Sequence, residues 1–166
     1  MDTTSRNALW HQFGAAIDML DNALQACPEE LWRDRSREPQ FWYLTYHTLF
    51  WLDLYLSGSL EGFSPPPPFT LTELDPAGTL PDQVYTREEL AGYLQHGRAK
   101  CRATIDALTP NEAGRRAAFA GLDLTIGELL LYNLRHVQHG AAQLNLILRQ
   151  NTGAAPHWIR RVTGGA

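Results

Sequence analysis

The residues of this chain whose types and spacing could support chemistry are histidines. His136 and His139 lie three residues apart in the stretch LRHVQHGAAQLN, which covers residues 134–145. Two imidazoles at a spacing of three or four on one helix can bind one metal ion, because both reach the same side of the helix. The same spacing also fits a polar stripe between packed helices. Two histidines alone leave both interpretations open.

Helical geometry predicts which neighbours share a face with His136. At about 100° per residue, Gln143 returns to within about 20° of His136, whereas His139 is displaced by about 60° and Gly140 by about 40°. The predicted inward stripe therefore carries Asn133, His136 and Gln143, with His139 at its edge. A second element has to supply the other side chains of any site.

His47 is the candidate on that second element. Tyr43, His47, Trp51 and Leu54 recur at helical spacing, so the imidazole is predicted to lie in a buried aromatic face. A buried imidazole without a partner costs about 1–3 kcal/mol, and it therefore needs a hydrogen bond or a metal ion. His47 is thus either a paired core histidine or a metal ligand.

The remaining polar candidates are weaker. His11 is expected to face outward or sideways and His96 to be solvated, while nothing in the C-terminal tail determines the direction of His157. No separate nucleophile stands out. Asp53 is the nearest carboxylate in sequence, but at six residues beyond His47 it is displaced by about 120° round the helix.

Four helices are predicted to position these residues, over residues 4–26, 39–57, 86–108 and 125–150. The first shows apolar residues at intervals of three and four, the second is apolar almost all round, and the last two begin at Thr-x-x-Glu capping boxes. The chain is therefore predicted to be all-α, an up-and-down four-helix bundle. Sites in such bundles form from side chains of facing helices.

A proline-rich stretch separates the second and third predicted helices. Residues 57–85 contain six prolines, too many for a regular element. Because too little chain follows for a second core, we expect a long loop within a single domain that spans residues 1–166. Loops of this length in compact domains are often functional, and the run Pro65–Pro68 is expected to form a wall of the site.

Composition and charge exclude several classes of protein. The formal net charge of −4 is spread along the chain without a basic stripe, so nucleic acid is not an expected partner. No run of about 18 apolar residues and no signal-peptide pattern occurs, so we expect no membrane partner and a cytoplasmic location. Cys27 and Cys101 lack CxxC spacing and are expected to be buried or idle thiols.

The chain resembles the DinB-like superfamily over nearly its whole length. The resemblance rests on YHTLFWLDLYLSG in the second predicted helix, YTREELAGYLQHGRAK at the third and LLLYNLRHVQHGAAQLNLILRQ in the fourth. It implies a bundle that holds a divalent metal, often zinc or nickel, through one histidine of the second helix and two residues spaced by four on the last. The corresponding residues are His47 and His136, with the family's glutamine at Gln143.

The chain departs from that family pattern at Gly140, where the second ligand of the last helix is expected. Glycine has no side chain to coordinate a metal. The third ligand would then have to be His139, turned inward through the space that Gly140 is expected to leave open. Catalytic zinc usually has three protein ligands, so His47 and His136 alone would hold an ion poorly.

Two functions follow as alternatives. In the first, zinc or nickel held by His47, His136 and His139, with Gln143 beside them, serves a metal-dependent hydrolase or thiol-dependent transferase that acts on a small molecule. In the second, the metal site is degenerate, and the bundle binds a small apolar ligand or acts as a dimeric interaction protein. The apolar second helix also predicts a homodimer, because it has more apolar surface than one small bundle readily covers.

Overall fold

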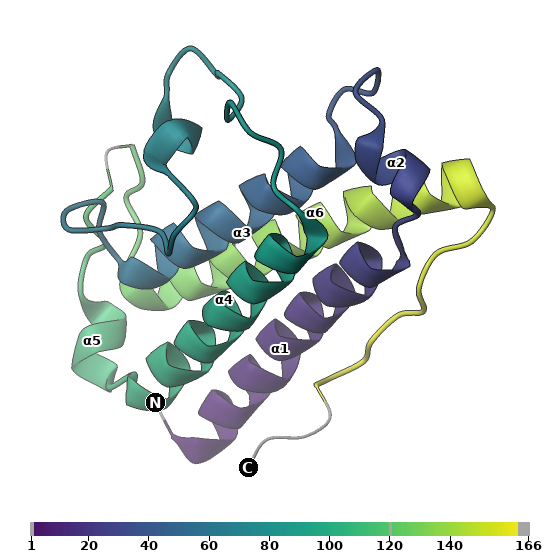
Figure 1. Ribbon diagram of the computed structural model, residues 1–166. Helices are drawn as coiled ribbons and strands as arrows, with labels where there is room; N and C mark the ends of the chain where they lie inside the picture. Colours follow the sequence, from purple (N-terminus) through teal and green to yellow (C-terminus); the bar gives the residue numbers. More distant parts are fainter. Residues whose placement is uncertain (1, 120, 163–166) are drawn as a thin grey trace.

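The computed structural model describes residues 2–119 and 121–162, and in these ranges it contains helices but no strand (Figure 1). The elements are α1 (Thr3–Ala26), α2 (Glu29–Arg33), α3 (Phe41–Ser57), the 3-10 helix η1 (Leu71–Leu74), α4 (Arg87–Ala107), α5 (Pro110–Gly114) and α6 (Ile126–Thr152). The all-α class is confirmed, and the short α2 and α5 extend the expected set of four helices. Met1, Ala120 and residues 163–166 lie outside the described ranges. The single domain predicted over residues 1–166 is therefore described only within residues 2–119 and 121–162.

Side-chain caps determine where α4 and α6 begin. Thr86 accepts a hydrogen bond from the backbone N–H of Glu89, and the Glu89 carboxylate accepts one from the backbone N–H of Thr86. Thr125 and Glu128 make the same exchange at α6. Each exchange satisfies two N–H groups that the first turn of a helix leaves unpaired. These local signals explain why the predicted helix starts lie within about one residue of the observed ones.

The four long helices pack in a ring whose order differs from their order along the chain. α1 and α3 each contact both α4 and α6, so α1 lies across the ring from α3. Figure 1 shows α3 and α4 running in one direction and α1 and α6 in the other. The second and third long helices are therefore parallel, whereas the predicted up-and-down order required them to alternate. Bundles with a long crossover connection permit this arrangement.

The crossover is residues 58–86, which we call the excursion. Phe69 stacks on Tyr93 of α4 with ring centroids 4.3 Å apart, and Tyr85 lies 4.9 Å from Tyr46 of α3. Phe69 and Tyr85 are both buried. The apolar surface of α3 is thus covered in part by its own chain. This weakens the surface argument for a homodimer, which stays a prediction.

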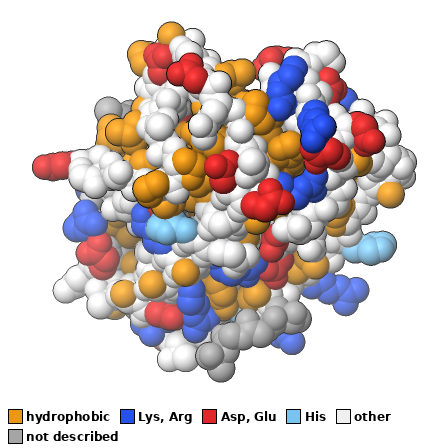
Figure 2. All heavy atoms as spheres, in the orientation of Figure 1, with side chains coloured by type: hydrophobic (Ala, Val, Ile, Leu, Met, Phe, Trp, Pro, Cys, Tyr) orange, Lys and Arg blue, Asp and Glu red, His pale blue; other side chains and the backbone are white. Residues whose placement is uncertain are grey.

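The surface and the cysteines fit the expectations from composition. On the face in Figure 2, acidic and basic side chains lie interspersed. Cys27 and Cys101 are free and buried. Among the described residues, no helix is long and apolar enough to cross a membrane.

Candidate functional site

A cleft of about 430 Å³ opens between α3, α6 and the excursion, and the predicted site residues line it. His47 comes from α3, while His136, His139 and Gln143 come from α6. The ring centroids of His47 and His136 are 5.4 Å apart. His139 and Gln143 are exposed and lie at the edge of the cleft. The structure therefore brings His47 and His136 together, with the other two residues beside them.

His136 is half-buried in the wall of the cleft. Burial, and then the neighbouring His47, lower the pKa of His136 to about 4, while a hydrogen bond to the backbone of Thr48 acts in the opposite direction. Nε2 of His136 is buried and has no hydrogen-bond partner among the described residues. A lowered pKa keeps this imidazole neutral, and a neutral imidazole is the form that binds metal ions.

Glu73 is the cleft residue that sequence reasoning missed. It lies on η1 in the middle of the excursion, and its side chain is only 5% exposed. Nδ1 of His47 donates to Oε1 of Glu73, and Nε1 of Trp51 donates to the same oxygen at 3.2 Å. In the part of the chain that the structure describes, the buried Oε2 has no partner of good hydrogen-bond geometry. The available signal was a glutamate in the sequence LTEL, and only the folded excursion shows which helix it meets.

The excursion lines the cleft through residues other than those predicted. Glu73 and Gly78 face the cavity, whereas the run Pro65–Pro68 is not part of its lining. The prolines were expected to form the wall because they dominate the stretch. They lie instead ahead of Phe69, and the wall is built by the segment that follows this buried ring. The negative charge of Glu73 also acts on Tyr43, because burial first and Glu73 second raise the pKa of Tyr43 to about 12.

Gly140 does not leave open space beside His136. A Cβ built on Gly140 would lie 2.2 Å from Oγ1 and 2.8 Å from Cγ2 of Thr48. Thr48 is fully buried, and its hydroxyl donates to the carbonyl of Leu44 at 2.7 Å. Glycine therefore allows α3 and α6 to approach closely. The expected vacancy, through which His139 would turn inward, is filled by Thr48.

The donor set fits a divalent ion in part. The bond between Nδ1 of His47 and a carboxylate is the arrangement that commonly orients metal-binding histidines. Within residues 2–119 and 121–162, however, no group of three or more His, Cys, Asp or Glu side chains is placed to hold a metal ion. An ion bound here would depend on His47 and His136, with water or substrate completing its coordination.

Asp53, the carboxylate nearest to His47 in sequence, serves a different interface. It is 1% exposed, and its Oδ1 accepts from Nζ of Lys100 at 2.5 Å. Tyr93 donates to Oδ2 at 3.1 Å, and Nε2 of His96 lies 3.4 Å from Oδ1. These partners are all on α4. Asp53 therefore links α3 to α4 and does not serve as a base for the cleft.

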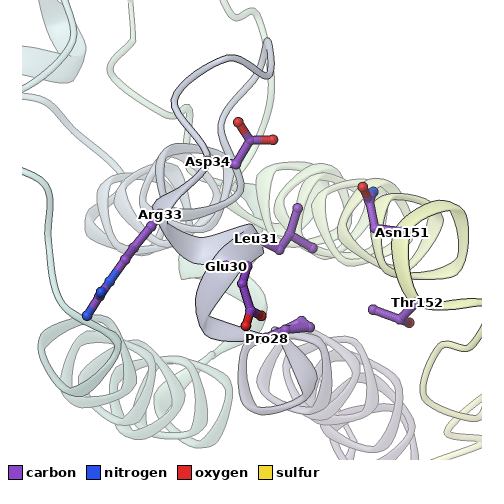
Figure 3. Close-up of a pocket in the computed structure, with 7 residues that line it drawn as sticks. All are labelled: Pro28, Glu30, Leu31, Arg33, Asp34, Asn151 and Thr152. Carbon is purple, nitrogen blue, oxygen red and sulfur yellow. The ribbon is translucent and has the colours of Figure 1, made fainter.

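A second depression, of about 440 Å³, lies between α2 and the end of α6. Figure 3 shows its lining, and the side chains of Glu30, Arg33 and Asp34 point in different directions. Arg33 forms an exposed ion pair with Glu29 at 2.6 Å. The charged groups of this depression do not converge on one point, whereas the rings of His47 and His136 lie together in the cleft.

Comparison with known proteins identifies the family. A model of the DinB superfamily matches residues 12–144, a range that includes the excursion and the helix segments carrying His47 and His136. Neither a search of curated proteins nor a search of solved structures gives a match. The match covers most of the chain and confirms the resemblance inferred from the motifs. The chain belongs to the DinB superfamily.

Proposed function

We propose that the cleft binds a divalent metal ion, zinc or nickel, through Nε2 of His47 and Nε2 of His136. One observation carries the proposal: the rings of His47 and His136 lie with their centroids 5.4 Å apart, and Nδ1 of His47 is engaged by Glu73. Both rings line the same cleft, and the buried Nε2 of His136 has no partner in the described ranges. A buried polar atom of this kind needs either a hydrogen-bond partner or a metal ion.

The activity proposed for this site is that of a metal-dependent hydrolase or a thiol-dependent transferase acting on a small molecule. A bound divalent ion lowers the pKa of a coordinated water or thiol. His139 and Gln143, at the edge of the cleft, are proposed to contact the substrate. The cavity volume lies within the range of small-molecule sites. The buried, unpaired cysteines favour a reducing compartment, so we propose a cytoplasmic location.

A second candidate function is a bundle that binds a small apolar ligand without metal. The contact between Thr48 and Gly140 favours it, because this contact occupies the position at which the family's third ligand is expected. In that case His47 and His136 are hydrogen-bonded groups of the cavity wall. The two functions differ in whether a metal ion is bound at all.

Isothermal titration with zinc and with nickel, on protein prepared without an affinity tag and stripped of metal, tests the proposal. The parent is expected to bind one ion, and His47→Ala and His136→Ala to abolish binding. His11→Ala is the matched control, because His11 does not line the cleft. His139→Ala shows whether this residue adds a third bond. Absence of binding in the parent, or equal binding in the parent and His47→Ala, would favour the apolar-ligand function.

A further inference from the structure

We infer that Glu73 is a positioning residue for His47. The excursion, which carries Glu73, therefore contributes to the function of the site. The inference rests on the proposed function in one respect, namely that Nε2 of His47 is the atom that binds. Its structural basis is independent of any metal. Glu73 is contributed by η1, far from both histidine-bearing helices in the chain, and it meets His47 only when the excursion is folded against α3.

The contact determines the tautomer of His47. A carboxylate only accepts hydrogen bonds, so the proton of a neutral His47 has to reside on Nδ1, which faces Glu73. The other ring nitrogen, Nε2, then carries the lone pair. Nδ1–H bonded to a carboxylate also makes a histidine a better ligand, because it orients the ring and increases its basicity.

Glu73 is itself held in place. Nε1 of Trp51 donates to the same oxygen that His47 contacts, and Trp51 lies one helical turn beyond His47 on α3. Two donors on one face of α3 therefore direct a single oxygen of Glu73. Tyr43, which also lines the cleft, interacts with the same carboxylate, and the second, buried oxygen has no partner of good hydrogen-bond geometry among the described residues.

Attachment of the excursion to the four long helices does not by itself explain why a glutamate stands at position 73. Phe69 on one side of η1 and Tyr85 on the other are buried and already hold the excursion against α3 and α4. A buried carboxylate is a costly way to attach the excursion, since an apolar side chain at the same position would avoid the loss of hydration. The contact is better explained by what it does to His47.

The test uses the metal-free full chain first. Nitrogen-15 NMR of the histidine rings at pH 8 is expected to show His47 in the parent with its proton on Nδ1. In Glu73→Ala the Nε2–H form should appear, whereas Glu73→Gln should retain the parent tautomer, because its side-chain oxygen still accepts from Nδ1. Glu61→Ala is the matched control, a glutamate of the same excursion that is exposed. Circular dichroism checks that each variant is folded.

Zinc titration of the same variants forms the second arm. Zinc affinity is expected to fall by about 10- to 100-fold in Glu73→Ala, to fall less in Glu73→Gln, and to stay unchanged in Glu61→Ala. A folded Glu73→Ala variant that keeps the Nδ1–H tautomer of His47 would overturn the inference, even if zinc binds. If the tautomer changes and the parent binds no zinc, the inference stands and the proposed metal function fails.

Discussion

Thr48 of α3 occupies the position in which any side chain of residue 140 on α6 would stand. Both γ atoms of Thr48 lie within 2.8 Å of a Cβ built on Gly140, so rotation of the threonine about χ1 cannot clear the space. A β-branched residue in a helix also has little rotamer freedom. The residues at positions 48 and 140 therefore constrain each other, and a ligand at position 140 requires a smaller residue at position 48.

Gly140→Ala is expected to destabilise the protein. Overpacking of this kind typically costs about 1–3 kcal/mol, which exceeds the gain of about 1 kcal/mol from replacing glycine by alanine in a helix. Gly92→Ala in α4 is the control, since a Cβ there meets no atom within 4 Å, and it should be neutral or stabilising. Urea denaturation measures both. Adding Thr48→Ala to Gly140→Ala should recover part of the loss, and full stability of Gly140→Ala alone would contradict the close contact.

Gly140→His is expected to lower stability without tightening zinc binding, because its Cβ has no room beside Thr48. The double variant Thr48→Ala, Gly140→His removes both γ atoms and should supply an imidazole four residues from His136, a register that suits zinc. Zinc titration combined with thermal unfolding compares the single and the double variant. Tight zinc binding by a fully stable Gly140→His variant would show that α3 and α6 separate more easily than we expect.

Lys100→Met is expected to destabilise the protein by about 3–5 kcal/mol. The change removes Lys100 from the buried Asp53 carboxylate and leaves the Tyr93 hydroxyl and the His96 ring beside it, and a buried charge that loses its cation is costly. Adding Asp53→Asn should restore much of the stability, because the charge is then removed as well. Arg33→Ala, which breaks an exposed ion pair with Glu29, is the control and should change stability by less than about 1 kcal/mol. Equal losses for Lys100→Met and Arg33→Ala would mean that Asp53 is hydrated.

The thiol of Cys27 is expected to react with Ellman's reagent at pH 8 only when the protein unfolds. Burial raises the pKa of Cys27 to about 12, so the folded thiol stays protonated where an unfolded thiol ionises. Between pH 9 and 12 the folded state therefore binds more protons than the unfolded state, and the free energy of unfolding falls as pH rises. Cys27→Ala should weaken that fall when urea denaturation at pH 8 and pH 10 is compared with the parent. Rapid labelling of the folded parent would contradict the burial of this thiol.

The homodimer is still a prediction from the apolar second helix. Light scattering at micromolar concentration is expected to show a species of dimer size. A species of monomer size alone would mean that burial beneath the excursion is sufficient for α3. The alternative of a dimeric interaction protein would then lose its support.

The helices could be predicted from sequence because their signals are local. The exchange between Thr86 and Glu89 involves residues three apart, and so does that between Thr125 and Glu128. The stripe that places His136 toward α3 is also a local pattern. Three features could not be predicted, because each depends on which distant segments meet. They are the order of the helices in the ring, the contact of Thr48 with residue 140 and the role of Glu73. Gly140 illustrates the difference: the missing side chain was evident from the sequence, but its replacement by a threonine of another helix was not.

The length of the excursion exceeds what the parallel arrangement of α3 and α4 requires. The 17 residues of α3 rise about 26 Å, a distance that an extended chain covers with about 8 residues. The excursion from residue 58 to residue 86 is more than three times as long. The additional residues include Phe69 and Tyr85, which pack on the helices, and Glu73, which lines the cleft. A shortened connection could therefore preserve the path between α3 and α4 and still lose the site, so the stability and the function of this protein should respond differently to deletions in the same segment.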